Sequence, residues 1–110
     1  MKLAIVGSRN IGKIDIGQYI HNKPSEIISG GAKGIDTLAA QYAKSNGIPL
    51  TEYLPNYDKY GRAAPIVRNK QIVSEADKVL ALWDGKSRGT LSSIRFAKKM
   101  GKEIQIIEIK

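Results

Sequence analysis

Three glycine-bearing turns carry the residues of this sequence that are best suited to chemistry. They are Gly7-Ser8-Arg9, Ser29-Gly30-Gly31-Ala32-Lys33-Gly34 and Asp84-Gly85-Lys86-Ser87-Arg88-Gly89-Thr90. Glycine allows the backbone to approach a ligand closely, and the first turn of a following helix offers unpaired N–H groups and a partial positive charge. We therefore expect amides from the three turns to converge on one anion, with charge or a hydroxyl added by Arg9, Lys33 and Thr90. This pattern predicts a phosphate-bearing ligand, although each turn alone also fits an ordinary tight turn.

Three further polar residues belong to this predicted site. Asp36 falls in the first turn of a predicted helix, where a carboxylate can cap free N–H groups or contact a ligand, for instance a ribose hydroxyl. Arg68 and Asn69 lie with Lys70 in the stripe of a predicted helix, 66–76, that should be buried. Buried polar side chains need partners. Either an internal hydrogen-bond network forms, or Arg68 binds a phosphate while Asn69 bridges loops or contacts a base edge.

The composition argues against several classes of site. The chain has no Cys and one His, His21, which excludes a disulfide framework, a thiolate zinc site and a cysteine nucleophile. A single His also gives poor support for Ser/His/Asp catalysis. Neither GxxxxGK[ST] nor GxGxxG occurs, which argues against an ATPase and an ordinary NAD-dependent dehydrogenase. We expect no metal and no separate cofactor, and no residue is predicted to be catalytic.

The elements that must position these turns alternate along the chain. Apolar runs predict strands at 2–6, around 27–28, and at 48–54, 79–83 and 104–109. Apolar residues at helical spacing predict helices at 14–21, 35–43, 66–76 and 91–100, with a long loop at 55–65. This order favours parallel pairing with right-handed crossovers. The predicted fold class is α/β: one three-layer Rossmann-like domain over residues 1–110, with a mainly parallel five-stranded sheet and its ligand beyond the strand carboxyl ends.

Charge and hydropathy bear on the partners of the chain. Its 110 residues include 18 Lys and Arg against 10 Asp and Glu, a net charge of +8. This excess favours a phosphorylated or polyanionic partner and equally fits a solvated basic surface. In the predicted loop, Tyr57 and Tyr60 lie close to Lys59 and Arg62, a pattern that can stack single-stranded bases or simply line a flap. No apolar run approaches the roughly 20 residues of a bilayer span, so we expect a cytoplasmic protein with no membrane partner.

Four motifs in order resemble the SLOG superfamily, which unites DNA-processing protein A with the lonely-guy phosphoribohydrolases. They are Val6-Gly7-Ser8-Arg9, the stretch from Ile28 to Asp36, Arg68-Asn69 and the stretch from Trp83 to Thr90. The resemblance covers nearly the whole chain and is closest to the small YpsA-related members. It implies a Rossmann-like fold, a ligand derived from a nucleotide and a homodimer.

The lonely-guy enzymes cleave the N-glycosidic bond of nucleoside 5′-monophosphates with an arginine and the glutamate of a GGxGTxxE turn. By resemblance, Arg68 corresponds to that arginine and Gly89-Thr90 to the GT pair, whereas Ser93 stands at the glutamate position. A serine cannot stabilise an oxocarbenium-like centre or activate water as a carboxylate does. Hydrolysis by this chain would therefore need a substitute acid from among Asp36, Asp84 and Glu75.

DNA-processing protein A, which binds single-stranded DNA, is similar in its SGxAxGID stretch and in its RN pair. Residues 29–36 and Arg68-Asn69 match these two motifs. The leading hypothesis is a sensor or processing protein that binds a nucleotide or nucleotide-derived small molecule through its glycine-rich turns. The alternatives are hydrolysis of nucleoside monophosphates and binding of single-stranded DNA.

Overall fold

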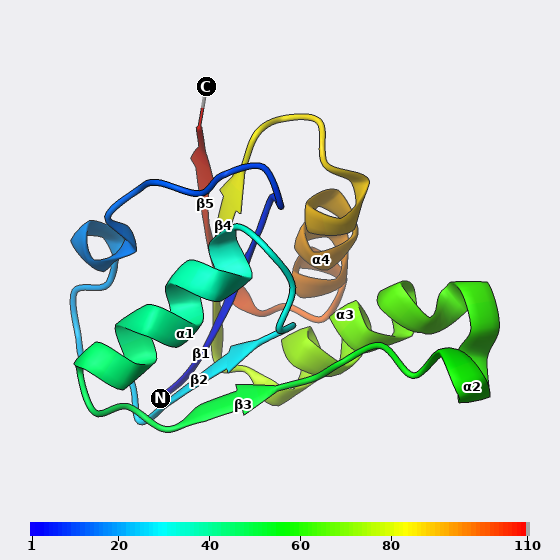
Figure 1. The fold of residues 1–110 in the computed structure, drawn as a ribbon, viewed down its shortest axis with the longest axis horizontal. Coiled ribbons are helices and arrows are strands. Elements are labelled where there is room, and N and C mark those ends of the chain that lie inside the picture. The colour runs from blue at the N-terminus through cyan, green and yellow to red at the C-terminus, as the bar shows by residue number, and fades with distance from the viewer. Residues whose placement is uncertain (110) are drawn as a thin grey trace.

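Within residues 1–109, which the computed structural model describes, five parallel strands form one sheet (Figure 1). The strands are β1 (Lys2–Gly7), β2 (Glu26–Ser29), β3 (Leu50–Glu52), β4 (Lys78–Trp83) and β5 (Glu103–Glu108), in the order β3-β2-β1-β4-β5. The strand order reverses between β1 and β4, and Gly7 pairs with Leu82, so these two strands end side by side. A ligand crevice is expected at such a reversal.

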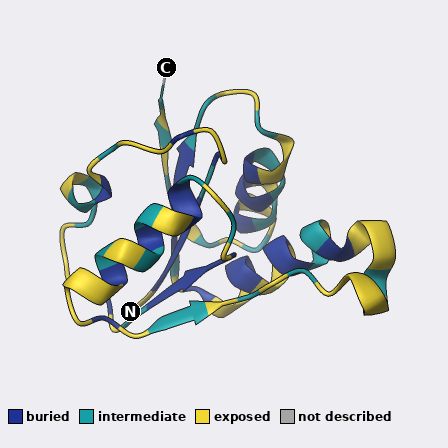
Figure 2. Cartoon of the chain, viewed as in Figure 1, coloured by how far each residue is buried: buried dark blue, intermediate teal, exposed yellow. Residues whose placement is uncertain are grey.

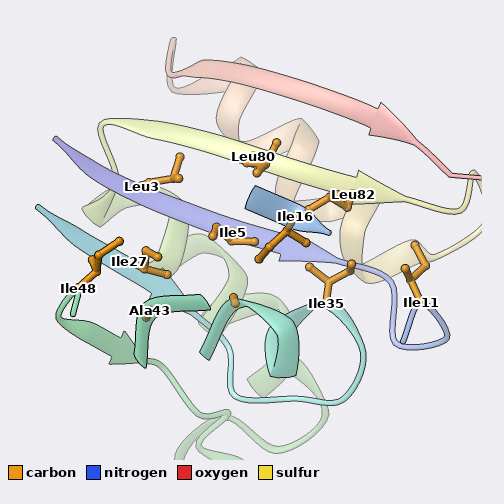
Figure 3. Packing of buried hydrophobic residues seen from close by; sticks show 11 residues of the cluster. Leu3, Ile5, Ile11, Ile16, Ile27, Ile35, Ala43, Ile48, Leu80 and Leu82 are labelled. Atoms are coloured by element: carbon orange, nitrogen blue, oxygen red, sulfur yellow. The ribbon is translucent and has the colours of Figure 1, made fainter. Parts of the chain in front are cut away.

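Helices cover both faces of the sheet, as predicted. On one face lies α1 (Ile35–Ser45), and on the other lie α3 (Ala64–Glu75) and α4 (Arg88–Lys99) (Figure 1). Alternate residues of β1 point to opposite layers, because successive side chains of a strand face opposite ways. Leu3 and Ile5 pack with Ile35 of α1 (Figure 3), whereas Ala4 and Val6 pack in the layer of α3 and α4. The α/β three-layer architecture is confirmed.

The inner strands β1, β2 and β4 are mostly buried, whereas no residue of the edge strands β3 and β5 is fully buried (Figure 2). The helices α1, α3 and α4 each bury one side and expose the other. In α4, Ile94 and Ala97 are buried while Arg95, Lys98 and Lys99 are exposed. This is the amphipathic pattern of a surface helix. No helix within residues 1–109 has the length and the apolar character that crossing a bilayer requires.

The prediction of a helix at 14–21 is wrong. The segment has only one 3-10 turn, η1 (Ile16–Tyr19), and Ile20 is already extended. Asp15 accepts a hydrogen bond from the Gly17 amide at 3.1 Å and so closes a local turn. Ile16 is buried in the core layer of α1 (Figure 3). The apolar spacing thus reflects an irregular segment that covers the sheet, in which Gly17 also weakens helix formation.

The predicted loop at 55–65 is wrong as well, because most of it is helical. It contains α2 (Tyr57–Tyr60), η2 (Gly61–Ala63) and the start of α3. Asn56 caps α2 by accepting a hydrogen bond from the Lys59 amide at 3.1 Å. Pro65 lies in the first turn of α3, where its missing N–H leaves no hydrogen bond unmade. These two signals for a helix start outweigh the Pro and Gly content from which a loop is predicted.

The third strand is shorter than the predicted range of 48–54. It spans Leu50–Glu52 and pairs only with the short β2, from Ile27 to Ser29. The chain past its end still donates one hydrogen bond, from the Tyr53 amide to the Ser29 carbonyl oxygen at 2.9 Å. The length of β3 is therefore limited by its neighbour, since β2 ends where the Gly30-Gly31 turn begins.

Candidate functional site

A cleft of about 350 Å³ lies where β1, β2 and β4 end. Ten of the fourteen predicted site residues line it: Gly7 and Arg9 after β1, Gly30 after β2, Asp36 of α1, Arg68 and Asn69 of α3, and Asp84, Ser87, Gly89 and Thr90 around the start of α4. The topology thus brings together residues from three turns and three further residues on two helices. The cleft is at the lower end of the range of about 300–1,000 Å³ that small-molecule sites occupy.

Four predicted site residues do not line the cleft. Ser8 is buried, and its hydroxyl accepts a hydrogen bond from the Asp84 amide at 3.1 Å, which ties the turn after β1 to the turn after β4. Gly31 has a φ of 69°, which favours glycine, and Lys33 is exposed. Ser29 is completely buried. These residues shape or flank the turns.

The cleft also has lining residues that the sequence did not single out as site residues, namely Val6, Asn10, Ala32, Pro65 and Ile72. Asn10 directly follows the first glycine-bearing turn, and a polar residue at that place was a usable signal. Ser93, at the position of the family's glutamate, lines the cleft too, and its hydroxyl donates to the Gly89 carbonyl oxygen at 3.4 Å. Glu75 is not among the lining residues.

Arg68 is held in place by three acceptors. Nη1 donates to the carbonyl oxygens of Gly30 at 2.7 Å and Tyr53 at 3.4 Å, and Nε donates to Oδ1 of Asn69 at 3.0 Å. Nη2 makes no hydrogen bond to any residue in 1–109, although the side chain is only 7% exposed. The predicted internal network therefore forms, and it leaves one guanidinium nitrogen for a ligand. Burial lowers the pKa of Arg68 below its ordinary value, and nearby Asp36 opposes this fall. The guanidinium stays charged because the ordinary pKa of arginine is far above neutral.

Asn69 connects Arg68 to the start of α4. While its Oδ1 accepts from Arg68, its Nδ2 donates to the Gly89 carbonyl oxygen at 3.4 Å. Asn69 thus connects α3 with the start of α4, which is the bridging role that the sequence predicted as one possibility. The prediction fails for two neighbours on the same helix, because Ile66 is 55% exposed and Lys70 is exposed. The buried stripe of α3 is instead formed around Arg68, Asn69 and Ile72.

Asp36 lines the cleft as a buried carboxyl. Its Oδ2 accepts a hydrogen bond from the Ala32 amide at 3.1 Å, so it caps the turn that precedes α1. Burial raises the pKa of Asp36, and the Ala32 amide, the Ser29 hydroxyl and the charge of Arg68 oppose this rise. The Ser29 hydroxyl lies close enough to act on the carboxyl, yet it is outside hydrogen-bond geometry with every residue in 1–109. The Asp36 carboxyl can accept a hydrogen bond from a ligand and, when it is protonated, can donate one.

The turn after β4 uses its own carboxylate to satisfy its amides. Asp84 Oδ1 accepts hydrogen bonds from the amides of Lys86 and Ser87, both at 2.8 Å, and these two bonds lower the pKa of Asp84. Ser87 in turn caps α4, because its Oγ accepts from the Thr90 amide at 3.3 Å. Asp84 thus binds two amides that were expected to be free for an external anion.

Some amides of the glycine-bearing turns and of the helix that follows are already used inside the protein. The Ala32 amide is paired with Asp36, and the Ile35 amide donates to the Ser8 carbonyl oxygen at 3.3 Å. In the first turn of α4, only the amides of Arg88 and Gly89 make no hydrogen bond to a residue in 1–109. The positive end of α4 therefore offers two free amides to the cleft. In the other two turns, the amides of Arg9, Gly30, Gly31, Lys33 and Gly34 also make no hydrogen bond to a residue in 1–109.

Within the described residues, no group of three or more His, Cys, Asp or Glu side chains could hold a metal ion.

The tyrosines of the predicted flap lie on α2, which Figure 1 shows set apart from the sheet. Tyr57 is 58% exposed, and Lys59 Nζ lies 5.3 Å from the ring centroid of Tyr60. Tyr57 does not line the cleft, and neither does Tyr60.

Comparison with known proteins identifies the family from the N-terminal part of the chain. No curated protein and no solved structure matches significantly. A family model described as "YspA, cpYpsA-related SLOG family" matches residues 1–60, more than half of the chain and including the first two glycine-bearing turns. The chain therefore belongs to the YspA, cpYpsA-related SLOG family.

Proposed function

We propose that this protein binds a nucleotide or a nucleotide-derived ligand in the cleft at the ends of β1, β2 and β4. The observation that carries the proposal is Arg68, a buried cation that is fixed through Nη1 and Nε and has Nη2 unpaired among the described residues. A guanidinium that is already positioned loses little freedom when it binds a phosphate, and its planar geometry suits phosphate oxygens. Membership in the SLOG family supports the same class of ligand.

In this proposal, the phosphate of the ligand lies against Arg68 and the start of α4. The free amides of Arg88 and Gly89 are at the positive end of that helix, where an anion is favoured. Arg9 lines the same cleft and adds charge. The negative charge of Asp84 is compensated by two amides, so it opposes a phosphate less than a free carboxylate would. Asp36 is left to accept a hydrogen bond from a sugar hydroxyl.

Thermal unfolding with a panel of nucleoside monophosphates tests the proposal. At a ligand concentration of about 100 times Kd, binding to the native state adds roughly 2.7 kcal/mol of stability. For a domain of this size, that corresponds to a rise in Tm of about 10 °C. Inorganic phosphate and free nucleosides serve as partial ligands and should give smaller shifts. The absence of any shift with the whole panel would overturn the proposal.

Gly89→Asp is the sharpest variant for this test. A Cβ at position 89 meets no atom within 4 Å, so the side chain fits. A carboxylate in the first turn of α4 is also stabilised by the helix dipole. The folded protein should therefore keep or increase its Tm while it loses the ligand-induced shift. Gln41→Glu, on the exposed side of α1, makes the same change of net charge outside the cleft and should keep the shift.

Hydrolysis of an N-glycosidic bond is a second candidate, favoured by the environment of Asp36. Burial raises the pKa of this carboxyl, which lines the same cleft as Arg68 and Ser93. In the reaction, the C1′–N bond breaks and the departing base takes the electron pair together with a proton from the Asp36 carboxyl. Water forms the new C1′–O bond and returns a proton to the carboxylate.

Release of free base from nucleoside monophosphates, followed by chromatography, tests this second candidate. Asp36→Asn should abolish release, whereas Glu75→Gln, outside the cleft, should leave it unchanged. If the wild-type protein binds a nucleotide in the thermal assay but releases no base, the protein is a binding protein and the hydrolase candidate is excluded.

A further inference from the structure

A second cavity, of about 240 Å³, lies next to the cleft and shares Arg68 with it. Its other walls come from the segment around α2 and from one face of α3, and they include Leu54, Asn56, Lys59, Tyr60 and Gln71. The cavity thus combines an aromatic ring, an apolar side chain, an ammonium group and two side-chain amides. Apart from Arg68, none of the residues that line the second cavity also lines the cleft.

Arg68 connects the two cavities through its hydrogen bonds. Its Nη1 reaches the carbonyl oxygen of Gly30, in the wall of the cleft, at 2.7 Å. The same nitrogen reaches the carbonyl oxygen of Tyr53 at 3.4 Å, directly before Leu54 in the wall of the second cavity. The guanidinium therefore lies at the boundary between the cavities. Nη2, which has no hydrogen-bond partner in 1–109, belongs to a side chain that lines both cavities.

We propose that the ligand is a dinucleotide, with one nucleoside in the cleft, its internal phosphate group against Arg68, and the second nucleobase in the cavity lined by Tyr60 and Gln71. This inference rests on the proposed function and specifies its ligand class. A pyrophosphate link and a 3′,5′-phosphodiester link present the same chemistry to Arg68, namely phosphate oxygens between two nucleosides. The experiment below distinguishes these two sources.

The residues of the second cavity fit a nucleobase. Tyr60 provides an aromatic surface for stacking, and Lys59 Nζ lies 5.3 Å from its ring centroid, so a positive charge accompanies the ring. Asn56 uses Oδ1 to cap α2, and its Nδ2 makes no hydrogen bond to a residue in 1–109. The Gln71 side chain likewise has no hydrogen-bond partner there. These amide groups can pair with the polar edge of a base.

Equilibrium binding of two sets of nucleotides tests the proposal. The first set consists of the monophosphates AMP, GMP, CMP and UMP. The second consists of the matching homodinucleotides, each with a pyrophosphate link and with a 3′,5′-phosphodiester link. For at least one base, we expect a dinucleotide to bind at least about fivefold more tightly than its monophosphate, because stacking of a second base contributes that much or more.

Two variants on the same short helix provide a matched comparison. Tyr60→Ala removes the aromatic wall of the second cavity and should bring the ratio of the two affinities close to one. Tyr57→Ala removes an exposed tyrosine of α2 that lines neither cavity and should leave the ratio unchanged. Gln71→Trp, which fills the cavity from the exposed side of α3, should act like Tyr60→Ala.

The outcomes separate this inference from the function on which it rests. Equal affinities for monophosphates and dinucleotides would overturn the dinucleotide proposal and leave nucleotide binding intact. Failure of both sets to bind would overturn both. An affinity that keeps rising with oligonucleotide length, and that Tyr57→Ala weakens as much as Tyr60→Ala, would also overturn it, in favour of a single-stranded nucleic acid that follows α2.

Discussion

Nη1 of Arg68 lies 2.7 Å from the carbonyl oxygen of Gly30, a residue 38 positions away in the chain. A side chain at position 30 would not fit beside this contact, because a Cβ there would be 2.5 Å from Nη1 of Arg68 and 3.0 Å from Oδ2 of Asp36. Glycine therefore allows the cation of α3 and the carboxylate of α1 to approach the same stretch of backbone. This close approach determines which charges face the cleft.

Gly30→Ala should displace Arg68 and destabilise the fold. Overpacking of a tightly packed site costs about 1–3 kcal/mol of unfolding free energy, which urea denaturation can measure. Gly12→Ala is the matched control, because a Cβ there meets nothing within 4 Å and its φ is not positive. We expect the control to change the unfolding free energy by less than about 0.5 kcal/mol. Equal effects of the two substitutions would show that position 30 has more room than the structure indicates.

Arg68→Met should raise the pKa of Asp36 further above its ordinary range. Burial already raises this pKa, and the guanidinium of Arg68 is one of the groups that oppose the rise. Methionine retains much of the volume of the arginine stem but removes the charge. Carbon-detected NMR titration of the Asp36 carboxyl measures the effect. Arg9→Met should give a smaller rise, because Arg9 lowers the pKa of Asp36 less than Arg68 does. An unchanged pKa in Arg68→Met would mean that the two charges do not interact.

Much of the fold could be predicted because buried parallel strands leave a clear signal. The apolar runs at 2–6 and 79–83 became β1 and β4, which lie at the centre of the sheet and are covered on both faces. The segment at 14–21 could not be predicted in this way. Its apolar residues fill the core layer of α1 from a 3-10 turn and extended chain, and spacing alone cannot distinguish that arrangement from a helix.

The candidate site was predictable in its position and less so in its hydrogen bonds. Glycines after strands placed the turns at one edge of the sheet, since the ends of parallel strands gather there. Which amides remain free depends on side-chain geometry. Asp84 before Gly85 is a turn signal as much as a ligand signal, and its carboxylate binds the backbone of its own turn. The second cavity was missed because α2 was predicted as loop.

Asp36→Asn should stabilise the unliganded protein at neutral pH. The amide oxygen of Asn can still accept the hydrogen bond from Ala32, and the buried negative charge is removed. Because the folded pKa of Asp36 is raised, its contribution to stability is fully present below the unfolded pKa of about 3.9 and is lost as the pH rises through the folded pKa. The variant should therefore exceed the wild type in unfolding free energy at pH 7, and the difference should shrink in acid. A less stable variant at pH 7 would contradict this reasoning.

Asp84→Asn should show the opposite dependence on pH. The amides of Ser87 and Lys86 lower the folded pKa of Asp84, so the unfolded chain binds the proton more readily. The stability that Asp84 contributes is present above about pH 3.9 and is lost as the pH falls through the depressed folded pKa.

Asn keeps one oxygen to accept hydrogen bonds from these amides and loses only the charge. The Asp84→Asn variant should therefore be less stable than the wild type at pH 7, with a difference that vanishes in strong acid. Asp58→Asn is the control, because Asp58 is exposed and makes no side-chain hydrogen bond to a residue in 1–109. Urea denaturation at several pH values measures all three proteins, and a pH-independent loss in Asp84→Asn would show that its charge does not stabilise the turn.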